Sequence, residues 1–564
     1  MPHSPYALPA VIAVTLVTVA IGLYGLRFAR TTSDFLVASR EVSPTWNAAA
    51  IGGEYLSAAS FLGVAGLVLK YGVDVLWYPV GFAAGYLALL LFVAAPLRRS
   101  GAFTLPDFCE LRLGSRSLRR LATAFVLFIG WLYLLPQLQG AGLTLHTVTG
   151  GPYAVGVALV GVVVTANVAL GGMRSITFVQ AFQYWLKLTA LAVPIIFIAL
   201  QWQADGRPEL GRPTAPVFDV VTTVNLDRSA TLTLDAPVTV TAAGVVDRVR
   251  VDGPLELSAG RHTVSGGARL TFPAGSAVPA VSGTDIASPS DWLVPGHDLF
   301  GTYSLVIATF LGTMGLPHVL VRFYTNPDGA AARRTTLIVL GLVGVFYLFP
   351  TLYGVLGRVY TPQLLMTGQS DAVVLLLPAA ALGGGLTGQL LGALVAAGAF
   401  AAFLSSSSGL VTSVAGVLST DVLGRGSVRD FRRSAIIAGI VPAVLALRTS
   451  GLDVSQVVAL AFAVAASSFC PLLVLGIWWR GLTAIGASAG IVVGGGAAAS
   501  AVLVTVVGGP LDGWPGALLA QPAAWSVPLA FLVMIGVSLA TRSRVPTNVA
   551  STMLRLHAPD ALRL

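Results

Sequence analysis

The chain has 564 residues, of which 55% are hydrophobic and only 10% are charged. Ordinary soluble domains carry about 25% charged residues, so this composition excludes a soluble globular protein and indicates that most of the chain lies in lipid. The net charge of +9 does not indicate nucleic-acid binding, because the basic residues are scattered between apolar runs. The only cysteines, Cys109 and Cys470, offer neither a disulfide framework nor a zinc-ligand spacing.

Apolar runs long enough to cross a bilayer recur along the chain. A membrane helix needs about 20 mainly apolar residues, and counting such runs predicts about thirteen spans. We expect them at 7–27, 46–70, 73–97, 119–147, 152–171, 175–201, 298–325, 335–357, 386–420, 430–448, 455–479, 482–508 and 524–541. No basic segment precedes the first run, which favours a retained span over a cleaved signal peptide.

The distribution of arginine predicts the orientation of these spans. The short loops on one side, together with the tail 542–564, contain most of the arginines, among them Arg98 and Arg322. The short loops on the other side contain only Lys70, Arg358 and Arg448. Because basic residues favour the cytoplasmic side, we expect a multi-pass cell-membrane protein with its N-terminus outside and its C-terminus in the cytoplasm.

One long interval, 202–297, has a different pattern. It contains short segments in which polar and apolar residues alternate, such as Thr231–Asp235 and Arg261–Val264, and glycine or proline separates them. We expect a small extracytoplasmic β domain inserted between the membrane segments 1–201, with six spans, and 298–541, with seven. The insertion could cap the outer face or bind an unknown partner, and its sequence offers no ligand constellation.

The span at 46–70 contains residues that weaken a membrane helix. Gly52 and Gly53 lie in its middle, and Glu54, a carboxylate that hydrocarbon should exclude, follows them. This pattern predicts a helix broken near 52–56, whose carbonyls could bind a cation and whose N–H groups near Leu56 and Ser57 could face an anion. The alternative is an unbroken, glycine-packed helix in which a neutral Glu54 hydrogen-bonds to a neighbour.

A matching interruption occurs five spans later, near 312–317. Gly312 and Gly315 loosen the helix there, and Pro317 suits the first turn of a restarted helix because it lacks an N–H that would be unpaired. Two broken helices, each at the head of a block of five spans, predict an inverted five-plus-five repeat with a binding site at mid-membrane.

Three segments resemble the sodium:solute symporter family, and most closely its cation/acetate (monocarboxylate) branch. They are Gly53–Gly63, Gly312–Phe323 and Gly171–Ser175. The resemblance covers nearly all the spans and excludes the insertion. It implies an all-α polytopic membrane protein with a LeuT-like core in spans two to eleven, working by alternating access.

A polar face in the ninth span suggests where a cation binds. Ala402, Ser405 and Ser406 are spaced i, i+3 and i+4, so one carbonyl and two hydroxyls share a helix face and could ligate Na⁺. Alternatively, the serines bond back to carbonyls four residues earlier or join helices. For Ser407 and Ser408, which lie off that face, we favour this second interpretation.

The resemblance extends this set to five Na⁺ ligands, Gly53, Leu56, Ala402, Ser405 and Ser406. Gln180 stands where family members with a second sodium site carry an aspartate, so the resemblance implies one Na⁺ per cycle. Lys187 is the only lysine inside a span. It could reach the membrane surface or pair with Glu54, and the sequence does not decide between these.

Polar groups next to the two breaks are the candidates for solute binding. They are Tyr55, Ser57, Gln137, Gln139, Thr313, His318, Ser467 and Ser468. The N–H groups of the half-helix ends would hold a carboxylate, with its alkyl tail against Phe61, Leu316 and Trp131. We favour a packing role for His318, although a histidine could also carry a proton.

Together these features predict a secondary active transporter that moves a small monocarboxylate such as acetate, propionate or pyruvate with Na⁺. The alternatives are an H⁺-coupled carrier that uses Glu54 and His318, and a Na⁺ symporter of another small solute such as proline. A transporter-like sensor is less favoured, because only the short tail follows the last span. The loops lack the clustered carboxylates, histidines or cysteines of a surface enzyme, so we expect no enzyme.

Overall fold

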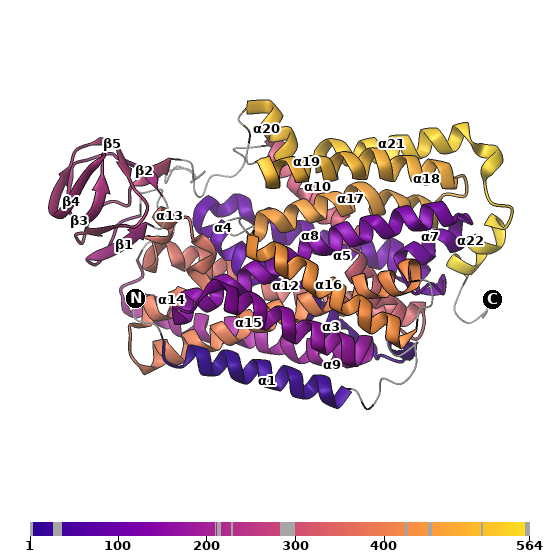
Figure 1. Cartoon of the computed structure of the whole chain (residues 1–564), viewed down its shortest axis with the longest axis horizontal. Coiled ribbons are helices and arrows are strands. Elements are labelled where there is room, and N and C mark those ends of the chain that lie inside the picture. The colour runs from indigo at the N-terminus through magenta and orange to yellow at the C-terminus, as the bar shows by residue number, and fades with distance from the viewer. Residues whose placement is uncertain are drawn as a thin grey trace.

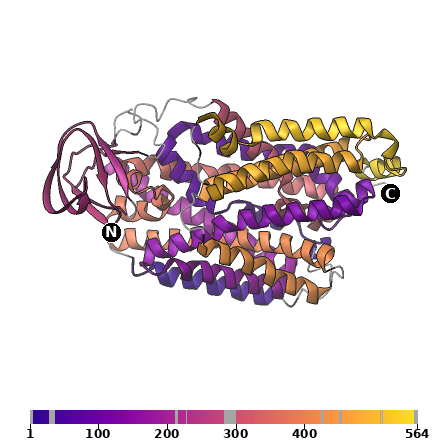
Figure 2. The ribbon, with the colours of Figure 1, turned by 45° about the horizontal axis from the view of Figure 1, so that its top comes forward.

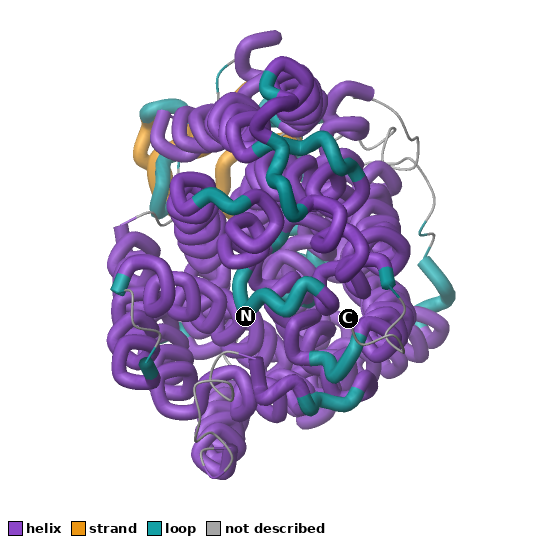
Figure 3. Tube along the Cα trace, turned by 90° about the vertical axis from the view of Figure 1, so that its right-hand side faces the viewer, coloured by secondary structure: helices purple, strands orange, loops and turns teal. Residues whose placement is uncertain are grey.

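The computed structural model shows a bundle of long helices with a small β-sheet at one end (Figure 1). It describes residues 4–25, 27, 37–208, 210, 216–226, 229–282, 299–423, 427–448, 454–508, 511 and 513–558. The sheet projects beyond the helices (Figure 2). Seen from the opposite end, the helices pack side by side around one another (Figure 3). The last part of the predicted insertion, 283–297, and the end of the tail, 559–564, lie outside the described residues.

The α-helices of the bundle differ widely in length. They are α1 (Ala7–Gly25), α3 (Pro44–Tyr55), α4 (Val64–Tyr71), α5 (Trp77–Ala88), α6 (Ala94–Arg99), α7 (Leu105–Leu113), α8 (Arg116–Thr149), α9 (Tyr153–Ala204), α10 (Leu299–Gly315), α11 (Pro317–Val321), α12 (Gly329–Tyr360), α13 (Leu364–Thr367), α14 (Val373–Leu382), α15 (Leu386–Val417), α16 (Val428–Arg448), α17 (Val454–Trp478), α18 (Ala484–Gly490), α19 (Gly496–Gly508), α20 (Gly513–Ala520), α21 (Ala523–Ala540) and α22 (Val549–His557).

Most of these helices lie at the positions of the predicted spans, whereas α7, α13, α14, α20 and α22 lie outside them. Among the described residues, ten segments are long and apolar enough to cross a membrane. One of them, α9, joins two predicted spans and bends at Gly172, whose φ of 58° and ψ of −164° suit glycine. The predicted class, a helical membrane protein with a small sheet, is confirmed, whereas the count of thirteen spans stays a prediction.

The two ends of the bundle differ in what they carry. The start of α1 lies at the end that bears the sheet, and α22 lies at the opposite end (Figure 1). This relative placement agrees with the predicted topology, in which the N-terminus and the insertion share one side of the membrane. Which of the two ends faces the cytoplasm stays a prediction from the arginine distribution.

The first break lies later in the sequence than the glycine pair suggested. Helix α3 runs through Gly52 and Gly53 and ends at Tyr55, with Leu56 as its cap residue at φ −75° and ψ 82°. The break therefore lies at the end of the predicted interval 52–56, at Leu56, and not at the glycines. They serve packing instead, because a Cβ on Gly53 would collide with the carbonyl oxygen of Gln180 on α9. Since α3 stops at Tyr55, carbonyls of its last turn are free to bind other groups.

The second break lies at Leu316, between α10 and α11. Leu316 is extended, with φ −70° and ψ 116°, and α11 begins at Pro317. Proline therefore occupies the first turn of the restarted helix, as expected for a residue without an N–H. A Cβ on Gly315 would collide with the carbonyl oxygen of Ala465, so this glycine lets α10 approach α17 closely.

The described residues of the insertion form a seven-stranded antiparallel sheet. Its strands are β1 (Thr222–Leu226), β2 (Ala230–Leu234), β3 (Val238–Val246), β4 (Val249–Leu257), β5 (Gly260–Val264), β6 (Ala268–Phe272) and β7 (Ala280–Ser282). They are ordered β1-β6-β3-β5-β2-β7, and β4 pairs with β3. Alternate residues such as Leu232, Val240 and Leu270 are buried, which explains the alternation seen in the sequence.

Candidate functional site

The end of α3 meets α9 and α15 around a small set of oxygen atoms. Ser405 on α15 donates its hydroxyl to the carbonyl oxygen of Gly53. The neighbouring Ser406 donates to the carbonyl oxygen of Glu54 at 2.5 Å. The ammonium of Lys187 on α9 donates to the carbonyl oxygens of Gly53 at 2.5 Å and Leu56 at 2.7 Å and to Ser405 Oγ at 3.1 Å.

The five predicted Na⁺ ligands lie close together in the structure. Gly53, Leu56 and Ser405 surround one point, which is the Nζ atom of Lys187. The carbonyl of Ala402 lies 3.3 Å from Ser405 Oγ, and Ser406 contacts the next carbonyl along α3. The residues are thus near one another, and a side chain of the protein itself sits among them.

Of the two sequence interpretations of Lys187, the one that places it at the membrane surface is wrong. Its side chain is fully buried, so it does not reach the membrane surface. Its hydrogen-bond partners are backbone and hydroxyl oxygens, while Glu54, which is in contact with Arg322, attracts it through space. The positive end of Lys187 therefore lies against the carbonyl end of a helix, where the helix dipole favours a cation.

Glu54 and Arg322 form a buried ion pair that connects the two broken segments. Arg322 Nε lies 2.6 Å from Glu54 Oε2, and the side chains are 0% and 1% exposed. Arg322 also donates to Thr177 Oγ1 at 2.9 Å and to Gln180 Oε1. Gln180 in turn donates to the carbonyl oxygen of Ser405 at 2.7 Å. Assigning Arg322 to a cytoplasmic loop was wrong, because Glu54 holds it inside the bundle.

Several of the predicted solute residues meet between the two breaks. Tyr55 and Thr313 share a hydrogen bond of 2.9 Å between their hydroxyls. Tyr133 donates its hydroxyl to Ser57 Oγ at 3.1 Å, and its ring centroid lies 5.1 Å from that of His318. Tyr133 on α8 therefore touches both the first and the second broken segment.

The two predicted glutamines of α8 are buried close to the first break. Gln137 Oε1 accepts a hydrogen bond of 2.9 Å from the backbone N–H of Ala58, where the chain becomes helical again. Gln139 is buried on the same helix. The apolar candidates are Phe61 and Leu316, which are fully buried, and Trp131, which is partly buried.

Ser467 and Ser468 do not join this group. Each donates its hydroxyl to the carbonyl oxygen four residues earlier on α17. Ser467 also shares a hydrogen bond of 2.7 Å with Ser526 on α21. Its hydroxyl thus points to a neighbouring helix instead of the breaks, and its prediction as a solute contact is corrected. Ser408 bonds back to Leu404, which confirms the structural interpretation of that serine.

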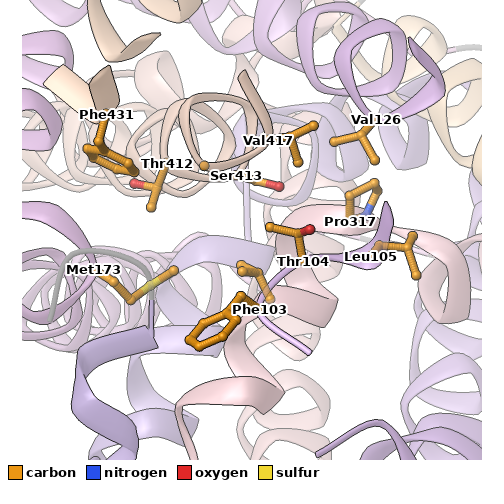
Figure 4. Close-up of a pocket in the computed structure, with 12 residues that line it drawn as sticks. Phe103, Thr104, Leu105, Val126, Met173, Pro317, Thr412, Ser413, Val417 and Phe431 are labelled. Carbon is orange, nitrogen blue, oxygen red and sulfur yellow. The ribbon is translucent and has the colours of Figure 1, made fainter. Parts of the chain in front are cut away.

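A small pocket lies beside the second break. Pro317 and Val321 of α11 line it, facing Thr412, Ser413 and neighbouring residues of α15. Its lining also includes Phe103, Thr104 and Leu105 at the start of α7 (Figure 4). Helix α7 lies toward the end that also carries α22 (Figure 1). The pocket thus lies between the start of α11, the second half of α15 and the start of α7.

The sequence matches a known family on both sides of the insertion. Residues 35–207 and 274–494 match the sequence model of the sodium:solute symporter family. The chain belongs to this family. The resemblance seen in the motifs around Gly53 and Gly312 is therefore confirmed. The relatives and structural neighbours of this family member are transporters, not enzymes.

Individual relatives cover almost the whole chain. It is 31% identical over 546 residues to the monocarboxylic acid transporter of Corynebacterium glutamicum, covering 90% of this chain and 87% of the relative. It is 29% identical over 540 residues to the uncharacterized symporter YwcA of Bacillus subtilis, covering 92% and 91%.

Solved structures of transporters share the fold. A Na⁺-coupled sialic acid symporter in a substrate-bound, outward-open state matches with a TM-score of 0.60 at 15% identity, covering 94% of this chain and 98% of that one. Mhp1, a nucleobase-cation-symport-1 transporter in a closed conformation, matches with a TM-score of 0.50 at 11% identity, covering 92% and 98%. The predicted LeuT-like architecture is confirmed by these neighbours.

The sequence interpretation missed Tyr133 and Thr177 and misplaced Arg322. For Arg322 a signal was present, because an arginine inside a predicted span that also faces an intramembrane carboxylate should be paired with it. For Tyr133 and Thr177 no such signal exists, since either residue is common in membrane helices. Their roles follow from contacts between helices that are distant in the sequence.

Proposed function

We propose that this family member is a cation-coupled symporter that carries a small monocarboxylate across the cell membrane by alternating access. The observation that carries this proposal is the meeting of the two helix breaks at Tyr133. The 31% identity to a monocarboxylic acid transporter over nearly the full chain supports the choice of solute.

The groups between the breaks suit an anion with one carboxylate. Backbone N–H groups at the start of a helix attract negative charge, and the segment after Ser57 begins such a helix. The hydroxyls of Ser57 and Tyr133 and the ring of His318 add hydrogen-bonding groups nearby. The one carboxylate here, Glu54, is ion-paired with Arg322, so it would repel a substrate anion less than a free carboxylate would.

Aromatic packing beside the first break favours a small solute. The ring of Tyr55 lies edge-on to Phe82 at 5.6 Å and to Tyr86 at 4.7 Å between centroids. Phe82 also packs on Phe462 at 5.1 Å and stacks on Tyr347 at 5.6 Å. These rings fill one side of the space beside the break. A short alkyl tail fits such surroundings better than a bulky solute does.

Two cations are candidates for the coupling ion. Membership of the sodium:solute symporter family favours Na⁺, as does the Na⁺ coupling of the sialic acid symporter that shares the fold. The ammonium of Lys187 on the expected ligands favours a carrier that runs without Na⁺ at this position, with H⁺ as the driving ion. The ion pair with Arg322 makes Glu54 a poorer candidate for the group that carries the proton.

Uptake into proteoliposomes tests the proposed function. Purified protein should accumulate radiolabelled acetate, propionate or pyruvate under an inward Na⁺ gradient or an acid-outside pH gradient. Unlabelled monocarboxylates should compete, and proline should not. We expect His318→Gln to raise the KM for the solute by about tenfold, as for a lost hydrogen bond of about 1 kcal/mol or slightly more.

Ser467→Ala is the matched control, because Ser467 faces α21 instead of the breaks. It should leave the KM close to that of the wild type. Saturable uptake of proline that acetate does not inhibit would overturn the proposal.

A further inference from the structure

The atoms around Lys187 are all hydrogen-bond acceptors. Ser405 uses its hydroxyl proton on the carbonyl of Gly53, so toward Lys187 it can only accept. The carbonyls of Gly53 and Leu56 are also acceptors only. All three atoms can accept, so the site suits an ammonium, which donates three hydrogen bonds.

Among the described residues no carboxylate is in ion-pair contact with this buried ammonium; Glu54 attracts it through space and is itself in contact with Arg322. A buried charge without a contacting counter-ion is costly unless dipoles solvate it. Here the dipoles come from the carboxyl end of α3, where the helix stops at Tyr55 and its last carbonyls lack partners within the helix. The end of α3 thus acts as a cation site, and Lys187 is the cation in it.

We propose that Lys187 is a built-in cation that occupies the coupling-ion position of this transporter and excludes Na⁺ from it. This inference deepens the proposed function, because it names what fills the cation position of the same site. The carbonyl of Gly53 accepts from both Lys187 and Ser405, so both of its lone pairs are used. A Na⁺ ion would have to displace the ammonium to reach these oxygens, and a second positive charge beside it would be repelled.

The neighbouring side chains on α9 add no negative charge that would favour a second cation. Gln180, seven residues before Lys187 and on the same helix face, is a neutral amide that bonds to the carbonyl of Ser405 and to Arg322. Removing the lysine charge while keeping the length of the side chain should therefore open the position to Na⁺. Lys187→Met does this, and it leaves Gly53, Leu56 and Ser405 as ligands.

The first experiment measures binding of radioactive Na⁺ to the purified full-length protein without solute. The wild type should bind no Na⁺ saturably, whereas Lys187→Met should bind it. Adding Ser405→Ala to Lys187→Met removes one ligand and should weaken this new binding by about tenfold, as for the loss of one good ligand. Saturable Na⁺ binding by the wild type, or none by a correctly folded Lys187→Met variant, would overturn the proposal.

The second experiment measures acetate uptake with Na⁺ or choline outside. The wild type should take up acetate equally well with either ion, and a clear Na⁺ requirement would overturn the Lys187 proposal. The wild-type measurements stand even if Lys187→Met fails to fold. Absence of uptake for every monocarboxylate would count against the proposed function alone, because the Na⁺-binding experiment contains no solute.

Discussion

The two broken helices have similar interruptions but contact different kinds of groups. At the first break, carbonyls from the end of α3 accept hydrogen bonds from Lys187 and from serines of α15. At the second break, the restarted helix begins with Pro317 and places His318 beside Tyr133. The first break therefore binds the positively charged end of Lys187, while the second offers neutral hydrogen-bonding groups.

The one charged group that the second segment contributes turns back to the first. Arg322, at the end of α11, reaches Glu54 on α3 and so ties the two segments together. The comparison teaches that an interrupted membrane helix does not have one fixed role. Its role depends on which end of the half-helix is free and on which side chains the neighbouring helices direct to it.

Removing Arg322 should have the largest effect on stability, because this residue joins the two broken segments. Arg322→Met leaves the carboxylate of Glu54 buried without its partner, and we expect a loss of about 3–5 kcal/mol in stability. The temperature at which half of the detergent-solubilised protein loses its monodisperse form on heating should fall sharply. The double variant Glu54→Gln with Arg322→Met is the control. It removes both charges and should recover much of the loss, so an equally unstable double variant would contradict the pairing.

A smaller change tests how Glu54 is positioned against α15. A Cβ on Gly409 would overlap the carboxyl group of Glu54, so Gly409→Ala should displace that side chain at a cost of about 1–3 kcal/mol. Gly392 lies on the same helix with nothing near its Cβ position, which makes Gly392→Ala the matched control. That control should be neutral or stabilise by up to about 1 kcal/mol. Equal thermal stability of the two variants would contradict the close contact.

Much of the fold could be predicted because lipid imposes strong patterns on a sequence. Long apolar runs marked the spans, arginines indicated an orientation, and alternation in 202–297 marked the strands. The break at Pro317 was also predictable, since proline has no N–H to leave unpaired. The break at Leu56 lies within the predicted interval 52–56 but after the glycines, because Gly52 and Gly53 could serve either flexibility or close packing, and packing against α9 decided the outcome.

The candidate site was predictable only in part. The face of Ser405 and Ser406 followed from helical spacing, and the carbonyls of Gly53 and Leu56 came from the family resemblance. That Lys187 points at these atoms could not be predicted, because it depends on how α9 packs against α3 and α15. Its two sequence interpretations assumed that a charge seeks water or a carboxylate. They overlooked the free carbonyl end of a helix as a third partner.

The smallest expected effect concerns His262, a histidine in the sheet whose surroundings differ from those of His318. His262 Nδ1 lies 2.7 Å from Asp247 Oδ2, and its Nε2 lies 2.9 Å from the carbonyl oxygen of Ser258. Burial alone would lower the pKa of His262, but the hydrogen bonds to Asp247 and Ser258 raise it above its ordinary 6.5. The hydrogen bond from His262 holds the pKa of Asp247 below its ordinary 3.8. By contrast, His318 Nε2 has no hydrogen-bond partner among the described residues.

These shifts predict how the stability of the β3–β4–β5 region changes with pH. The contribution of His262 is fully present below pH 6.5 and is lost as the pH rises through its raised folded pKa. The contribution of Asp247 is present above pH 3.8 and is lost only as the pH falls through its lowered pKa. Hydrogen exchange of the Thr263 amide, which donates to Asp247 Oδ1 at 2.7 Å, should therefore show easier opening at alkaline pH after correction for the intrinsic rate. Asp247→Asn should remove this dependence. An opening free energy that stays constant in the wild type from about pH 6 to about pH 9 would contradict the charged pair.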